Sequence, residues 1–249
     1  MRRKFEIHRE KGGSKGSGSS PRRSTIYRGV VLTFITLLLP SVSTPAQELK
    51  ELLEKVRQTY SDANRLHIKM HVKVYEGTSQ DAEKLLDQVA DIKKQATNYH
   101  YSFGEIRLLM NTQYQVVVDE LSKKIMVASR DPSTEKQLAD PFQMNLDSIF
   151  RLYDNPVLES SEDDMRTYRL DQSEGPISSV KLTLNTRAYT LKELSYTYRG
   201  GQYAVIEFLV FDIQPKFDAG EFQESKYVQL RAGSWHPATR LPGYEVIMN

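Results

Sequence analysis

Residues 66–77 read LHIKMHVKVYEG, and the spacing of the apolar side chains in this stretch decides the class of fold. Apolar residues occupy every second position from Leu66 to Val74, histidines and lysines fill the positions between them, and Tyr75 follows. Because successive side chains of a β-strand point to opposite faces, this period of two predicts a strand with one apolar and one polar face. Gly77 ends the run.

The segments around this strand predict a mainly β chain with helical additions. Before it, apolar residues at three- and four-residue spacing predict an amphipathic helix over residues 47–62. After it, short β-type runs cover residues 89–103, 106–110, 114–118, 125–129, 167–170, 179–185, 190–199 and 202–213. Gly200 and Gly201 join the last two runs, and a Gly-Gly link in which both residues take positive φ is typical of a tight hairpin. Since no helical pattern alternates with the strands, we expect an antiparallel sheet in an α+β fold.

One segment interrupts the strands. Pro132, Pro141 and Pro156 punctuate a helical pattern in residues 145–153, which predicts a helical insertion or lid near residues 141–156. The following stretch, ESSEDD at residues 159–164, has the composition of an acidic loop. No boundary divides the chain after residue 46, so we expect a single domain over residues 47–249.

The first 46 residues differ from the rest of the chain. They carry nine Lys and Arg against two acidic residues, and they include an uncharged apolar run, GVVLTFITLLL, at residues 29–39. Spanning a bilayer takes roughly 20 apolar residues, so the run suits the core of a signal peptide better than a membrane anchor. Pro40, Thr44 and Ala46 then favour cleavage between Ala46 and Gln47. We therefore expect a periplasmic protein, with an uncleaved inner-membrane anchor as the alternative.

The composition and motifs of the remaining chain favour a protein without catalysis. The absence of cysteine excludes disulfides, thiolate metal sites and a cysteine nucleophile. Residues 47–249 hold 25 basic and 30 acidic side chains, a balance that disfavours a nucleic-acid partner. His67 and His71 have the spacing of two helical metal ligands, but four residues of strand separate them by roughly 13 Å. Glu162, Asp163 and Asp164 have no apolar neighbours that would shift their pKa values for acid–base work. We expect neither a metal nor a cofactor.

Four stretches resemble a known family. NYHYSF at residues 98–103 with EIRLLM at residues 105–110 is similar to two of its strands. YQVVVDELSKKIMV at residues 114–127 resembles its hairpin, and FDAGEFQESKYV at residues 217–228 resembles its C-terminal piece. This is the LolA-like family of periplasmic lipoprotein carriers and lipid-handling proteins. The resemblance implies an open antiparallel β-barrel, a half-barrel sheet wrapped over a helical lid. It also implies a cavity for lipid or lipoprotein acyl chains, a membrane-associated donor or acceptor protein, and no catalytic residues.

Strand alternation selects the residues that would line such a cavity: Ile68, Met70, Val72, Leu108 and Met110. A second hypothesis is that the barrel is filled and the protein is a structural or interaction domain of the cell envelope, without a ligand. The single tryptophan, Trp235, is expected to anchor the C-terminal segment by packing.

Overall fold

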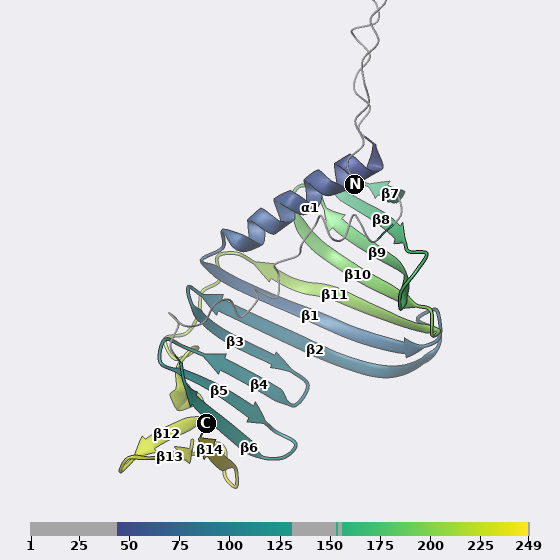
Figure 1. The fold of residues 1–249 in the computed structure, drawn as a ribbon. Helices are drawn as coiled ribbons and strands as arrows, with labels where there is room; N and C mark the ends of the chain where they lie inside the picture. Colours follow the sequence, from purple (N-terminus) through teal and green to yellow (C-terminus); the bar gives the residue numbers. More distant parts are fainter. Residues whose placement is uncertain (1–43, 131–152, 154–155, 249) are drawn as a thin grey trace, which may run out of the picture. The chain divides into compact units, whose positions relative to one another are not determined.

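The structure is a computed structural model that describes residues 44–130, 153 and 156–248, all of which belong to one compact unit, Ser43–Asn249. Most of the leader, and the insertion predicted near residues 141–156 apart from Tyr153 and Pro156, lie outside the described residues. Figure 1 shows one helix beside a large sheet. The elements are α1 Pro45–Ser61, β1 Arg65–Glu76, β2 Glu83–Gln95, β3 Asn98–Phe103, β4 Ile106–Met110, β5 Tyr114–Asp119, β6 Lys124–Ser129, β7 Val157–Glu162, β8 Met165–Asp171, β9 Ile177–Asn185, β10 Thr190–Tyr198, β11 Gln202–Asp212, η1 Glu224–Lys226, β12 Val228–Arg231, β13 Ser234–Pro237 and β14 Glu245–Met248.

Twelve strands form one curved sheet in the order β14-β6-β5-β4-β3-β2-β1-β11-β10-β9-β8-β7 (Figure 1). Two meanders, β1 to β6 and β7 to β11, join where β1 pairs with β11. The two edge strands, β14 and β7, do not pair, so the sheet stays open. This confirms the expected mainly β fold with an open antiparallel sheet. The exception is β14, which runs parallel to β6.

Helix α1 forms where the apolar spacing predicts it. Thr44 caps its N-terminus in a capping box with Gln47, and Pro45 occupies the first turn, where the missing N–H costs nothing. The apolar stripe is buried against the sheet: Leu49, Leu52, Leu53, Val56 and Tyr60. The cleavage point predicted between Ala46 and Gln47 lies inside this first turn, so a chain beginning at Gln47 would lack the Thr44 cap.

Three local expectations are wrong. Residues 89–103 are not one run but parts of β2 and β3, joined through Ala96, a non-glycine residue with φ 53° that gives no turn signal. Residues 157–162, which overlap the expected acidic loop, form β7, because pairing with β8 satisfies their backbone. The hairpin at the two glycines is present, but its loop has three residues and Gly201 alone has positive φ.

The sheet has a separate apolar core on each face. On the face that we call the helix face, α1 packs against β1, β2, β8, β9 and β10. On the opposite face, the outer face, residues of the C-terminal segment 214–248 cover β4, β5 and β6. Trp235 belongs to this second core and contacts Tyr114 edge-on, with ring centroids 5.0 Å apart. The expected anchoring role of Trp235 is thereby confirmed.

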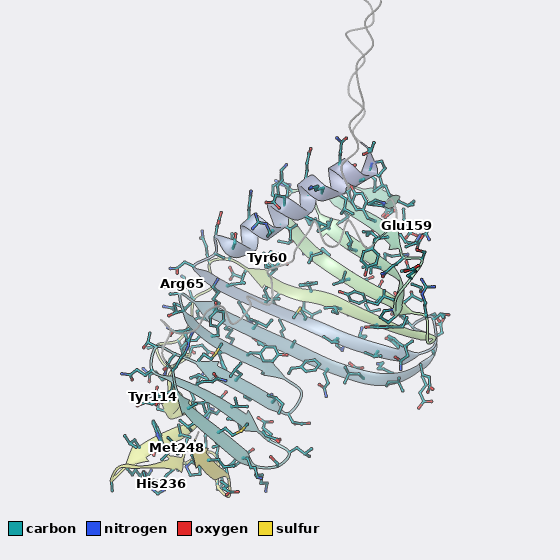
Figure 2. All side chains as sticks on the ribbon, in the orientation of Figure 1. Tyr60, Arg65, Tyr114, Glu159, His236 and Met248 are labelled. Carbon is teal, nitrogen blue, oxygen red and sulfur yellow. The ribbon has the colours of Figure 1, made fainter. Side chains whose placement is uncertain are left out.

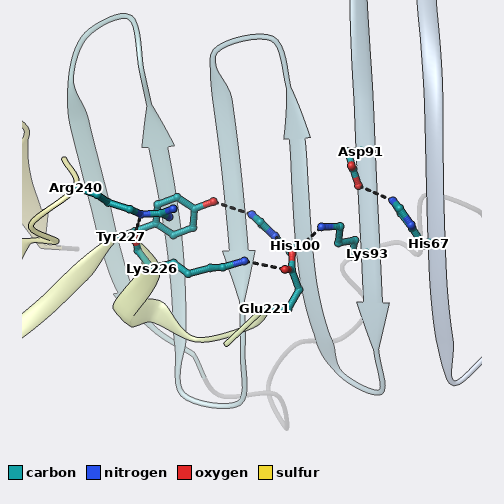
Figure 3. A network of polar contacts seen from close by, with 8 residues as sticks. All are labelled: His67, Asp91, Lys93, His100, Glu221, Lys226, Tyr227 and Arg240. Carbon is teal, nitrogen blue, oxygen red and sulfur yellow. Dashed lines mark hydrogen bonds and ion pairs between the residues drawn. The ribbon is translucent and has the colours of Figure 1, made fainter. Parts of the chain in front are cut away.

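A polar cluster, the Glu221 clamp, holds the C-terminal segment to the outer face (Figure 3). The Glu221 carboxylate accepts hydrogen bonds from Lys93 at 3.0 Å, from His100 at 2.7 Å and from Lys226 at 2.8 Å. Burial alone would raise the pKa of Glu221, but these three donors together outweigh it and lower the pKa to about 2. Glu221 is therefore ionised at neutral pH, although its side chain is only 10% exposed.

His100 links the clamp to Tyr227, whose hydroxyl lies 2.7 Å from Nε2. Burial lowers the pKa of His100, in opposition to its hydrogen bond with Glu221, so we assign a neutral ring. In that state Nδ1 donates to Glu221 and Nε2 accepts from the Tyr227 hydroxyl. Arg240 lies over the Tyr227 ring, 5.1 Å from its centroid. Together these contacts tie β2 and β3 to a segment more than a hundred residues later.

Candidate functional site: the apolar helix face

Register places one continuous row of apolar side chains on the helix face. Residues that are directly opposite in a pair of strands share a face, so the pairing can be followed from strand to strand. From β11 through β1 to β6 and then β14, the row is Phe211, Ile68, Ile92, Tyr101, Leu108, Val117, Met126 and Ile247. None of the eight side chains is charged. Figure 2 shows the side chains on the strands concerned.

The row is buried on β1 and β2, near α1, and more exposed on β4 to β6. Ile68 is fully buried and Ile92 is 9% exposed, and both belong to the core that includes the helix. Leu108 and Val117 are half-buried, and Met126 is 38% exposed. Next to this row, on the same face, lie Phe103 and its partner Ile106, whose side chain is 40% exposed. Among the described residues, α1 thus covers one half of an apolar surface whose other half, over β3 to β6, carries half-buried and exposed side chains.

The five residues selected from the sequence lie on this one face. Met70, Val72 and Leu108 are half-buried, whereas Ile68 lies beneath α1 and Met110 is 7% exposed. The structure thus brings the five together by register, and their role as a ligand-binding surface remains a prediction.

Sequence reasoning missed several side chains of the same face. Tyr101 and Phe103 alternate in β3, and Val117 and Met126 continue the row on β5 and β6. The alternation in NYHYSF was a usable signal, because Tyr99, Tyr101 and Phe103 occupy every second position. Burial raises the pKa of Tyr101, so its hydroxyl stays protonated at neutral pH and can donate a hydrogen bond.

The outer face of β1, β2 and β11 carries several pairs of oppositely charged or titratable side chains. His67 contacts Asp91 at 3.1 Å, His71 pairs with Asp87, and Lys73 contacts Glu207 at 2.9 Å. The two histidines therefore have carboxylate partners of their own on the face where alternation placed them. Within residues 44–130, 153 and 156–248, no three His, Cys, Asp or Glu side chains come together as a metal site. In the same ranges, no helix combines the length and the apolar character needed to cross a membrane.

The described residues thus form an open antiparallel sheet with a helix across one face, and comparison with known proteins finds distant similarities to solved structures. No family model and no curated protein matches the chain. An uncharacterized conserved protein from Thermus thermophilus is 8% identical, with a TM-score of 0.45 and coverage of 82% of this chain and 100% of that one.

Two further similar structures are known by a superfamily or a protein name. A LolA superfamily protein from Nitrosomonas europaea is 13% identical, with a TM-score of 0.29 and coverage of 74% of this chain and 99% of that one. LprF from Mycobacterium bovis is 10% identical, with a TM-score of 0.41 and coverage of 72% of this chain and 100% of that one.

Proposed function

We propose that this chain is an exported, periplasmic binding protein that holds acyl chains, of a lipid or a lipidated protein, on the helix face and performs no catalysis. The observation that supports this is the uncharged apolar row across eight strands, half of which continues beyond the cover that α1 provides. Soluble proteins rarely leave a contiguous apolar surface without a partner.

The energetics of such a surface suit reversible binding. Burying one methylene group is worth about 0.8 kcal/mol, so even a short segment of an acyl chain gains several kcal/mol without any specific polar contact. Met70 and Met126 add flexible side chains that adapt to an irregular ligand. A membrane-associated donor or acceptor protein would then take the chain over, since a surface of this kind can release what it binds.

The proposal assigns the five selected residues to two roles. Met70, Val72 and Leu108 contact the ligand directly, with Tyr101 and Val117 as neighbours in the row. Ile68 and Met110, which are buried, shape the surface from below. A charge introduced at a contact position would oppose the acyl chain, because a buried unpaired charge is costly.

The test compares charged variants on the two faces of the sheet. Leu108→Arg and Met126→Arg place a charge in the row, and Met126 is exposed enough to tolerate it. Val89→Arg is the matched control, because Val89 is 40% exposed and lies opposite His71 on the outer face. Binding is measured with a fluorescent fatty acid and by native mass spectrometry of protein purified gently from a membrane-containing lysate. Circular dichroism checks that each variant is folded.

We expect wild type and Val89→Arg to bind the probe alike and the two row variants to lose most of the binding. Full binding by folded Leu108→Arg and Met126→Arg would refute the assignment of this surface. A clean apo mass together with no probe binding by wild type would instead favour the filled domain that docks onto another envelope protein.

A further inference from the structure

A concave site lies away from the apolar row, where the C-terminal end of α1 meets the start of β1. It has a cavity volume of about 810 Å³, within the range of small-molecule sites. Four segments line it: the last turns of α1, residues 63–65, the β9–β10 turn at Tyr189, and residues 213–216 after β11. Figure 2 labels Arg65 at this end of the sheet.

The lining carries more positive than negative charge. Lys55, Arg65 and Lys216 come from three different segments, and Asp62 is the one carboxylate among the lining residues that the structure describes. No ion pair joins any of these three cations to a carboxylate of the described residues, and the contact found is from Lys55 to the Tyr189 hydroxyl at 3.4 Å. Elsewhere Lys73, Lys93 and Arg169 each have a carboxylate partner. The cations of this cavity are therefore available to an anion.

Tyr189 gives the cavity an aromatic wall at a conformational cost. Its φ is 51°, a left-handed conformation that a bulky side chain rarely adopts and that glycine would adopt freely. Lys55 lies 4.9 Å from the centroid of its ring. Strained residues of this kind persist where surrounding contacts hold them, and Tyr189 both packs against the helix-face core and lines the cavity.

We propose that this cavity binds a phosphate monoester. Arg65 offers a planar pair of N–H donors that match phosphate oxygens, while Lys216 and Lys55 supply two further charges and the Tyr189 hydroxyl a neutral partner. The lining has a net charge of +2, which suits a monoester with about −1.5 to −2 charges at neutral pH better than a singly charged diester or carboxylate. The ester is either a soluble metabolite or the headgroup of a monoester lipid. This site shares no residue with the apolar row and does not depend on acyl binding.

The experiment uses the full chain and two double variants with equal loss of charge. Arg65→Gln with Lys216→Gln changes the cavity, and both residues are exposed, so the fold should tolerate the change. Lys123→Gln with Lys124→Gln is the control, at the exposed β5–β6 turn. Glycerol 3-phosphate binding is measured by calorimetry, and binding to phosphatidylcholine vesicles with and without phosphatidic acid is measured by flotation. The basic leader is common to all three proteins, so its attraction to anionic vesicles cancels.

We expect wild type and the control to bind glycerol 3-phosphate and the cavity variant to bind it at least about tenfold more weakly, because two charge-assisted contacts are lost. A second outcome is that wild type binds only the vesicles with phosphatidic acid and that the cavity variant loses this binding. The proposal then holds, and the phosphate monoester is a lipid headgroup. Equal binding by both double variants, or no binding of either probe to wild type, overturns it. Leu108→Arg should bind glycerol 3-phosphate as wild type does, because Leu108 does not line the cavity. Failure of the acyl-chain proposal can therefore be told apart from failure of this one.

Discussion

Replacing Glu221 with glutamine should loosen the C-terminal segment from the outer face. The carboxylate is nearly buried and receives three hydrogen bonds from cationic or imidazole donors, so its removal leaves Lys93 and Lys226 without their counter-charge. A pKa lowered from 4.5 to about 2 corresponds to about 3 kcal/mol of stability at neutral pH. We expect Glu221→Gln to lose an amount of this order.

The pH dependence of that loss has a defined sign. Because the pKa of Glu221 is lower in the folded chain than in the unfolded chain, its contribution is complete above pH 4.5 and disappears as the pH falls towards 2. The difference in unfolding free energy between wild type and Glu221→Gln should therefore shrink from about 3 kcal/mol at pH 7 to about 1 kcal/mol at pH 3. His100 adds to the acid sensitivity, since its lowered pKa makes folding less favourable as the pH falls below 6.5.

The assay follows urea unfolding at pH 7 and pH 3 with two signals. Fluorescence of Trp235, the single tryptophan, reports on the C-terminal segment because its ring packs on Tyr114. Far-ultraviolet circular dichroism reports on the sheet. Asp218→Asn is the control, an exposed acid of the same segment. An unfolding midpoint for Glu221→Gln equal to that of Asp218→Asn at pH 7, or a difference that grows towards pH 3, would refute the reasoning.

Two further predictions concern α1. Leu53→Ala removes a side chain that is 2% exposed and should lower the unfolding free energy by about 2–5 kcal/mol. The control Leu121→Ala, at an 84% exposed position, should change it by less than about 0.5 kcal/mol. Urea unfolding followed by circular dichroism compares the two variants. Thr44→Ala removes the N-cap and should cost about 1 kcal/mol, while Thr44→Ser should restore most of it; equal stability of the alanine and serine variants would show that the cap contributes nothing.

Sequence patterns predicted best the strands that bury apolar side chains. The bounds expected for β4 agree with the structure, and those for β9 and β10 agree within two residues. In β9 the reason is plain, because Val180, Leu182 and Leu184 are buried at alternate positions. The first half of β2, EKLLDQ, and all of β7, VLESSE, were missed because they are largely exposed. Their backbone pairing with β1 and β8 holds them in the sheet, and a sequence pattern does not show such pairing.

The candidate site was predictable in part for the same reason. Alternation placed the five selected side chains on one face, as the strand register does, but it did not show where α1 crosses that face. Ile68 was therefore grouped with residues that lie beyond the helix. No pattern in the sequence indicated the Glu221 clamp. Glu221 stands in a polar stretch, and its partner His100 is 121 residues away, so only the folded chain brings them together.

Strand β3 contributes adjacent residues to the apolar row and to the Glu221 clamp. Tyr101 belongs to the apolar row on the helix face, and His100 belongs to the clamp on the outer face. Because neighbouring residues of a strand point in opposite directions, a charge placed in the row at Leu108 should leave the contact of Trp235 with Tyr114 unchanged. Unaltered Trp235 fluorescence in Leu108→Arg, together with lost probe binding, would then show that the row was disabled while the opposite face stayed folded. A shift in that fluorescence would mean that the two faces are coupled through β3 and β4, and loss of binding could no longer be attributed to the row alone.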